Sequence, residues 1–170
     1  MSFDVKPLEG YQDPYGLLCA ILQDGSREWR GELDPDIGLD AVTWRARPGG
    51  QSMGAIMLHI IHVEVAWIER FGLGRTLDPE EDRLLLADEI DVDAGVWPDP
   101  PNEPLSWYFE LHARLRLRTL EAIKSFPPPE TLKESRHGQL SMRWVLGHVI
   151  EHESYHGGQI VLLYDLWKSH

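Results

Sequence analysis

The chain has 170 residues, of which 42% are hydrophobic and 26% are charged, so it can form one domain with a substantial hydrophobic core. Its 16 Lys and Arg stand against 28 Asp and Glu, and the net charge of −12 argues against nucleic acid or an anionic membrane surface as the main partner. A single cysteine excludes an internal disulfide and a thiolate cage for a metal, which leaves histidines and carboxylates as the strong ligand types.

The sequence carries no targeting or repeat signal. The first residues, MSFDVKPLEGYQ, have no basic end followed by an apolar stretch, and no run approaches the ~18 apolar residues of a membrane span. No internal repeat or low-complexity tract divides the sequence. We therefore expect a single domain over residues 1–170 in a cytoplasmic protein that contacts neither membrane nor nucleic acid.

The first predicted helix begins at Asp13 and Pro14, an N-cap residue followed by a proline suited to the first helical position. It continues through the segment GLLCAILQDGSREWRGEL. One apolar stripe is expected to face the core, and it consists of Leu17, Leu18, Ile21 and Leu22.

The second predicted helix begins at Ser52, after the breakers at 48–50, and ends near Gly72. Its apolar residues recur at spacings of three and four, which places His59 among them on the inner face and His62 at the solvent edge. These apolar residues are Ile56, Ile60, Val63 and Trp67.

An acidic stretch from Thr76 to Val96 follows, interrupted by Pro79 and Gly95. Helix breakers and acidic residues in this density are typical of a connection rather than of a core helix. We expect a long connection that contains one short helix.

The third predicted helix lies between the prolines of 98–104 and Pro127. Its apolar stripe holds Leu105, Phe109, Leu111, Leu115 and Leu120, and three arginines are expected on the solvent side: Arg114, Arg116 and Arg118.

The fourth predicted helix starts near Ser141 and reaches almost to the carboxyl terminus. Trp144, Val145, Val149, Ile160, Leu163 and Trp167 repeat in it at helical intervals. Strand patterns are weak, because VTWRAR at 42–47 alternates only briefly before Pro48. Four amphipathic helices predict an all-α fold, a four-helix bundle with a long connection between its second and third helices.

Three histidines of the fourth helix, His148, His152 and His156, share a face with Val145 and Leu163. Each buried imidazole needs a polar partner, and a shared cation supplies one, since residues four apart on a helix can reach the same metal. His148 is equally compatible with an ordinary place at the rim of the core. The remaining histidines, His112, His137 and His170, are expected at the surface, as are Glu151 and Glu153.

The segment HVIEHESYHGGQI at 148–160, together with SMGAIMLHIIHVEVAWIERF at 52–71, closely resembles the DinB-like superfamily. This superfamily includes DinB and YfiT-type proteins and the S-transferases that use bacillithiol or mycothiol. The resemblance implies a four-helix bundle in which one histidine of the second helix and an HxxxH pair of the fourth hold a divalent metal. These ligands fall on His59, His152 and His156. The family often has arginine after the last ligand, where this chain has Gly157.

Three neutral imidazoles would leave a dication its full charge and at least one open coordination position, which favours catalysis over a structural role. Zinc and nickel are the expected metals, in that order. Gln159 lies on the ligand face and is a candidate hydrogen-bond partner of a ligand, and Tyr155 is a candidate proton donor. For both, packing or surface roles compete.

The resemblance implies a metal-dependent enzyme that transfers a low-molecular-weight thiol to an electrophilic small molecule, in a homodimer. Two alternatives stay open from the sequence. One is a hydrolase that uses a water activated by the metal. The other is a non-catalytic, stress-associated bundle that binds a metal only for structure.

Overall fold

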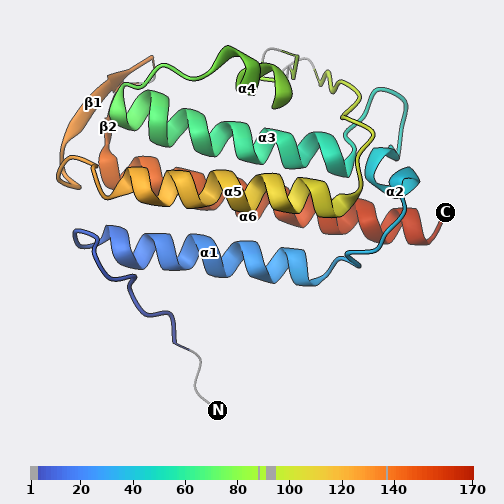
Figure 1. Ribbon diagram of the computed structural model, residues 1–170, viewed down its shortest axis with the longest axis horizontal. Coiled ribbons are helices and arrows are strands. Elements are labelled where there is room, and N and C mark those ends of the chain that lie inside the picture. The colour runs from blue at the N-terminus through green and yellow to red at the C-terminus, as the bar shows by residue number, and fades with distance from the viewer. Residues whose placement is uncertain (1–3, 88, 91–94, 137) are drawn as a thin grey trace.

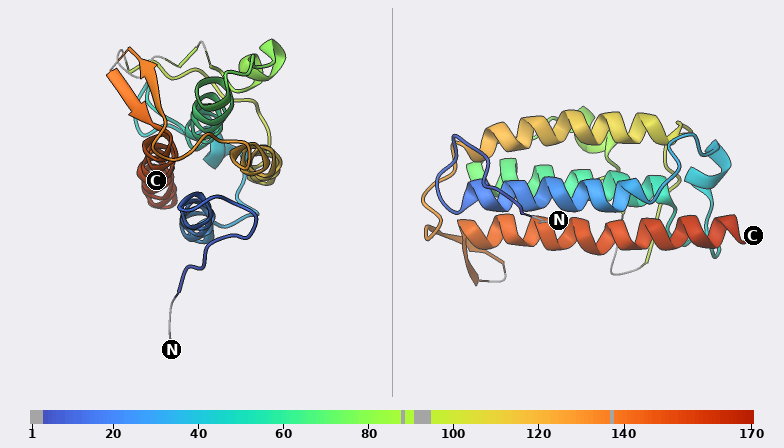
Figure 2. Two further views of the ribbon diagram at one scale, coloured as in Figure 1. Left: turned by 90° about the vertical axis from the view of Figure 1, so that its left-hand side faces the viewer. Right: turned by 90° about the horizontal axis from the view of Figure 1, so that it is seen from below.

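In the computed structural model, which describes residues 4–87, 89–90, 95–136 and 138–170, the chain is mostly helical with one small two-stranded sheet. Four long helical segments of the described chain lie side by side: α1, α3 with its extension η1, α5 and α6 (Figure 1). The end-on view places them around a shared interior (Figure 2). The elements are α1 (Tyr15–Gly31), α2 (Leu39–Thr43), α3 (Met53–Val65), η1 (Ala66–Gly72), α4 (Pro79–Leu84), α5 (Leu105–Ile123), β1 (Leu132–Ser135), β2 (Gly138–Ser141) and α6 (Met142–Lys168).

Two serines begin the helices that carry the histidine motifs, and this confirms both predicted starts. The Ser52 hydroxyl accepts a hydrogen bond from the backbone N–H of Ala55 at the start of α3. The Ser141 hydroxyl accepts one from Trp144 at the start of α6. Each cap satisfies a backbone donor that the first helical turn leaves without an internal partner.

A π-helical stretch, η1, continues α3 without a break. Val65, the residue at the junction, keeps right-handed helical angles with φ −61° and ψ −44°. The combined helix ends at Gly72, as predicted. At this end the chain packs closely, since a Cβ on Gly72 would lie 2.8 Å from the Phe126 ring.

Helix α1 differs from its prediction in two respects. The Asp13–Pro14 peptide is cis, and the helix begins at Tyr15 with no side-chain cap, so Asp13 is not the N-cap. The predicted stripe is wrong in part: Leu22 is buried, but Leu17 and Ile21 are each 37% exposed. The buried face recurs instead at alternating spacings of four and three, through Tyr15, Cys19, Leu22, Ser26 and Trp29.

The β-hairpin of β1 and β2 was not expected, because both strands are short and largely polar. The strands pair antiparallel, with Leu132 opposite Ser141 and Ser135 opposite Gly138. Gly138, the first residue of β2, has φ 107°, a backbone angle that favours glycine. The hairpin ends directly at the first turn of α6.

The connection between α3 and α5 contains the short helix α4, as predicted. The Asp78 carboxylate accepts from the backbone N–H of Glu80 and so caps it. The Arg118 guanidinium of α5 donates to both Glu81 and the buried Glu69, and this holds the connection against α5.

The core lies between the long helices, and α3 is buried along most of its length. Its residues Ile56, Leu58 and Ile61 are almost fully buried. In α5, the predicted leucines at 105, 111, 115 and 120 are buried as expected. Within the part of the chain that the structure describes, no helix is long and apolar enough to cross a membrane.

Candidate metal centre

Three histidines from two helices converge between α3 and α6. His59 comes from α3, and His152 and His156 come from adjacent turns of α6. The Nε2 atoms of His59 and His152 lie 3.1 Å apart, and the His152 and His156 ring centroids lie 4.4 Å apart. One ring nitrogen from each of the three residues lies within 4.8 Å of the others.

Burial keeps these imidazoles neutral. It lowers the pKa of His59 to about 4 and that of His152 to about 3, and the neighbouring imidazoles add to both shifts. The pKa of His156 is also lowered by burial. Neutral rings offer the lone pairs that a metal requires, so the three nitrogens form a donor set at neutral pH.

Gln159 fixes the orientation of one of these rings. Its Oε1 atom lies 2.7 Å from Nδ1 of His156, so a proton on Nδ1 is donated to the amide and Nε2 is left as the acceptor nitrogen. Such an outer hydrogen bond is the usual support of a metal-binding histidine. The Trp97 indole packs nearly perpendicular to the His59 ring, with the ring centroids 5.5 Å apart.

A pocket of about 560 Å³ adjoins His152. His148 stacks on Trp144 with the rings 4.9 Å apart, and Trp67 meets His148 edge-on at 5.0 Å. Val63, Leu140 and Arg136 complete the lining. His148 therefore lies in an aromatic wall, with its centroid 6.2 Å from that of His152.

Tyr155 and His62 also lie near the histidines. Tyr155 is 65% exposed, and only the edge of its ring meets His156. His62 is not at the solvent edge but half-buried beneath α4, with Nδ1 3.9 Å from an Asp82 oxygen.

Gly157 has a packing reason for its place in α6. A Cβ there would lie 2.6 Å from the Trp29 indole of α1. Glycine thus permits close approach of two helices. A Cβ on Gly158 would meet nothing within 4 Å, and the structure offers no packing account of that second glycine.

A second polar cluster, in the interior, was missed from the sequence. Glu64, His112, Arg116 and Glu153 are all buried, whereas Arg116, Glu153 and His112 were expected at the surface. Arg116 donates to both oxygens of Glu64, from Nε at 2.8 Å and from Nη2 at 2.7 Å, and also to Glu153. These charged groups can be buried because the guanidinium pairs with both carboxylates, which sequence position alone does not reveal.

Helix α1 supplies further partners to this cluster. Ser26 accepts from Arg116 Nη1 at 2.8 Å and donates to Glu153. The Trp29 indole N–H donates to the same carboxylate at 3.2 Å, and Thr119 donates to Glu64. The cluster consequently joins all four long helices.

The other two histidines that were expected at the surface are His170 and His137. His170 is exposed and lies against Trp44, with the ring centroids 5.6 Å apart. His137 lies outside the described residues. Cys19 is fully buried, which raises the pKa of its thiol to about 12 and leaves it unreactive.

The two clusters differ in their fit to a metal. In a tetrahedral site, nitrogens about 2.0–2.1 Å from the ion are roughly 3.3 Å apart, close to the 3.1 Å between His59 and His152. The oxygens of Glu64 and Glu153 also lie within 4.8 Å of a His112 nitrogen, but the Arg116 cation already binds both carboxylates. The histidine triad therefore fits a divalent cation better.

Comparison with known proteins gives a family. A search of curated proteins finds no match to the chain. The family model described as mycothiol-S-transferase matches residues 27–166, a range that includes both histidine motifs and confirms the resemblance to the DinB-like superfamily. Because the match spans most of the sequence, the chain belongs to the mycothiol-S-transferase family.

Proposed function

We propose that this protein is a divalent-metal-dependent transferase that joins the sulfur of a low-molecular-weight thiol of the mycothiol type to an electrophilic small molecule. The observation that carries the proposal is the convergence of three neutral imidazoles beside a pocket of about 560 Å³. Pockets of this size accommodate small molecules. Family membership favours the thiol over water as the nucleophile.

His59, His152 and His156 would hold the metal, with zinc as the first choice and nickel as the second. Bound there, the cation would supply a Lewis acid that lowers the pKa of a thiol. Gln159 accepts the Nδ1 proton of His156, which leaves Nε2 as the nitrogen that would bind the metal. Trp97 shields His59 from water.

The aromatic wall beside the triad would bind the substrate. Trp67, Trp144 and His148 offer flat apolar surfaces that exclude water and orient a small molecule next to His152. Arg136, beside the hairpin, adds a positive charge to the lining. With a chlorinated electrophile, a sulfur–carbon bond would form and the carbon–chlorine bond would break. Chloride would leave, and the thiol proton would pass to solvent.

The same proposal includes the wider organisation of the protein: a single four-helix-bundle domain over residues 1–170, in a cytoplasmic homodimer that binds no nucleic acid. Exposed apolar side chains support a subunit contact, among them Leu17 and Ile21 of α1 and Leu162 and Leu166 of α6. Light scattering coupled to size-exclusion chromatography tests the dimer. The net charge of −12 opposes DNA binding, and a gel shift at low salt tests that.

Metal content and activity test the enzymatic proposal. Protein purified without a metal-affinity tag is expected to carry one divalent ion per chain, and His59→Ala and His156→Ala are each expected to lose it. His170→Ala changes an exposed histidine outside the triad and serves as the matched control. Retention of stoichiometric metal in both triad variants would show that the histidine triad is not the metal site.

Activity separates the functions. The metal-loaded protein is offered mycothiol with chlorinated and epoxide electrophiles, and conjugates are measured by mass spectrometry. Conjugate formation that disappears in His156→Ala supports the transferase. Hydrolysis of the electrophile without any thiol would show that the protein is a hydrolase and not a transferase. A metal that stabilises folding, with no turnover of any kind, would replace it by a structural bundle.

A further inference from the structure

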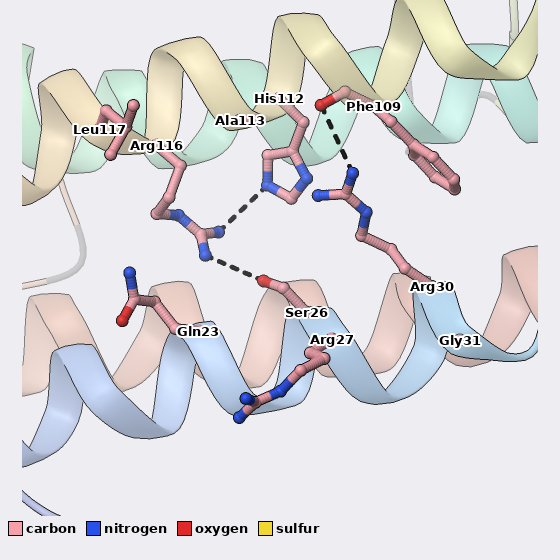
Figure 3. Close-up of a pocket in the computed structure, with 10 residues that line it drawn as sticks. All are labelled: Gln23, Ser26, Arg27, Arg30, Gly31, Phe109, His112, Ala113, Arg116 and Leu117. Atoms are coloured by element: carbon pink, nitrogen blue, oxygen red, sulfur yellow. Dashed lines mark hydrogen bonds between the residues drawn. The ribbon is translucent and has the colours of Figure 1, made fainter.

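A second pocket lies between α1 and α5 and shares no lining residue with the aromatic pocket beside His152. Its volume is about 520 Å³, and its wall combines apolar side chains with cationic ones (Figure 3). Phe109, Ala113 and Leu117 come from α5, and Arg30 comes from α1. The transferase chemistry proposed above uses none of these residues.

The floor of this pocket is already neutralised in part. Arg116 donates to the carboxylates of Glu64 and Glu153, so this buried group carries two negative charges against one positive charge. His112, which is 1% exposed, lies next to it. The floor therefore has no cation to spare for a ligand and repels strongly negative ones.

His112 presents an unused donor in the pocket wall. Its Nε2 lies 3.1 Å from Nη2 of Arg116, a donor atom, while the nearest carboxylate oxygens are at 3.7 and 3.8 Å. A proton on Nε2 would face another donor, so Nδ1 is the ring nitrogen that carries a proton directed away from Arg116. Nδ1 is buried and has no hydrogen-bond partner among the residues that the structure describes. A buried N–H without an acceptor is costly, and a ligand oxygen would relieve that cost.

Arg30 supplies the charge. Its guanidinium lies over the Phe109 ring, 4.2 Å from the centroid, and reaches the Phe109 carbonyl at 3.5 Å. It is half-buried, and within the described residues it forms no ion pair with a carboxylate. Arg27, by contrast, points to solvent and is paired with Asp24. In Figure 3, Arg30 lies on the side of the pocket toward which the second nitrogen of His112 is turned.

We propose that the pocket between α1 and α5 binds a small organic monocarboxylate with an apolar or aromatic body. The Arg30 guanidinium pairs with the carboxylate, and one carboxylate oxygen accepts from His112 Nδ1, which a small movement of the lining side chains would uncover. The apolar body lies against Phe109, Ala113 and Leu117.

A carboxylate suits these groups better than a phosphate. The planar guanidinium matches a planar carboxylate in shape and charge. A phosphate dianion would bring a second negative charge next to Glu64 and Glu153, which already exceed Arg116 by one charge. The apolar side chains opposite Arg30 also favour an organic body over a free inorganic anion.

Calorimetric titration of the metal-loaded protein with phenylacetate tests the proposal. Phenylacetamide is the neutral analogue, and inorganic phosphate is the competing anion. Arg30→Gln is expected to weaken phenylacetate binding at least about tenfold, the loss of one charge-assisted pair. Arg27→Gln is the matched control and is expected to bind as the wild type does. Circular dichroism and thermal unfolding check that both variants fold.

Binding of phenylacetate but not phenylacetamide, lost in Arg30→Gln and kept in Arg27→Gln, supports the proposal. Titration of His156→Ala separates this pocket from the metal centre, because the variant is expected to bind phenylacetate as the wild type does. Loss of binding in His156→Ala would place the carboxylate at the histidines instead. No binding to the wild type, unchanged binding in Arg30→Gln, or phosphate binding as tight as that of phenylacetate would each overturn the assignment.

Discussion

The histidine triad and the Arg116 cluster are two solutions to gathering polar groups inside one helical protein. The triad brings together three neutral rings, with no cation among the described side chains at their centre. The Arg116 cluster brings together two carboxylates and a histidine around a guanidinium that binds both acids. Proximity of ligand-type residues is therefore not sufficient for a metal site, because the carboxylates of one cluster already bind a cationic side chain and the imidazoles of the other do not.

The largest expected effect comes from removing that cation. Arg116→Met leaves two buried carboxylates unpaired, and we expect the free energy of unfolding to fall by about 3–5 kcal/mol, measured by urea denaturation. Arg114→Met, at an exposed position of the same helix, should change it by less than about 0.5 kcal/mol. Two metal ions bound per wild-type chain would show that the Arg116 cluster also binds metal. An Arg116→Met variant as stable as Arg114→Met would show that Arg116 is not needed to stabilise the two carboxylates.

The next expected effect is the pH dependence of the stability that the Glu64 carboxylate contributes. Burial alone would raise the pKa of Glu64, but Arg116 and His112 together outweigh burial and hold the pKa below the ordinary value of 4.5. A depressed pKa contributes stability that is present above about pH 4.5 and is lost as the pH falls further. We expect Glu64→Gln to be about 1–3 kcal/mol less stable than wild type at pH 7, with the gap closing below pH 4.5.

The control for this series is Glu121→Gln, which removes an exposed carboxylate paired with Lys124. Its stability should follow that of the wild type at every pH. A gap between Glu64→Gln and wild type that stays constant down to pH 3 would mean that the Glu64 carboxylate is not what the ion pair stabilises.

The smallest effect concerns the support of the triad. Gln159→Leu removes the acceptor of the His156 Nδ1 proton and should weaken metal binding about tenfold, measured by competition with a chromogenic chelator. Gln139→Leu in the hairpin, whose amide contacts only Glu134 among described side chains, is the control. Equal metal affinities in the two variants would show that Gln159 does not support the ligand.

Much of the frame follows from local signals in the sequence. Ser52 and Ser141 as caps, and the prolines at 98–104 and 127, set the limits of three long helices without knowledge of the rest. The four-residue spacing of His152 and His156 predicts that they lie on one face. Their meeting with His59 was expected only through the family resemblance, because spacing within one helix says nothing about a partner helix.

The Arg116 cluster could not be predicted in this way, because charged residues are usually exposed. The sequence around Arg116 does not identify the carboxylates that pair with it. One signal was available. Tyr108, His112 and Arg116 follow one another at intervals of four, so Arg116 shares a face with Tyr108 rather than with its neighbours Arg114 and Arg118. The hairpin of 132–141 carried even less information, because its strands have four residues each and few apolar side chains.

The π-helical segment η1 has a consequence for how the proposed enzyme can diverge. A π turn holds more residues than an α turn, so side chains beyond Val65 do not continue the angular series in which His59 lies. Trp67 belongs to η1 and faces the aromatic pocket, whereas His59 belongs to the regular turns before it. Insertions or deletions within η1 can therefore change the wall of the substrate pocket while His59 stays in place. Substrate selectivity and metal binding can thus change independently along one continuous helix.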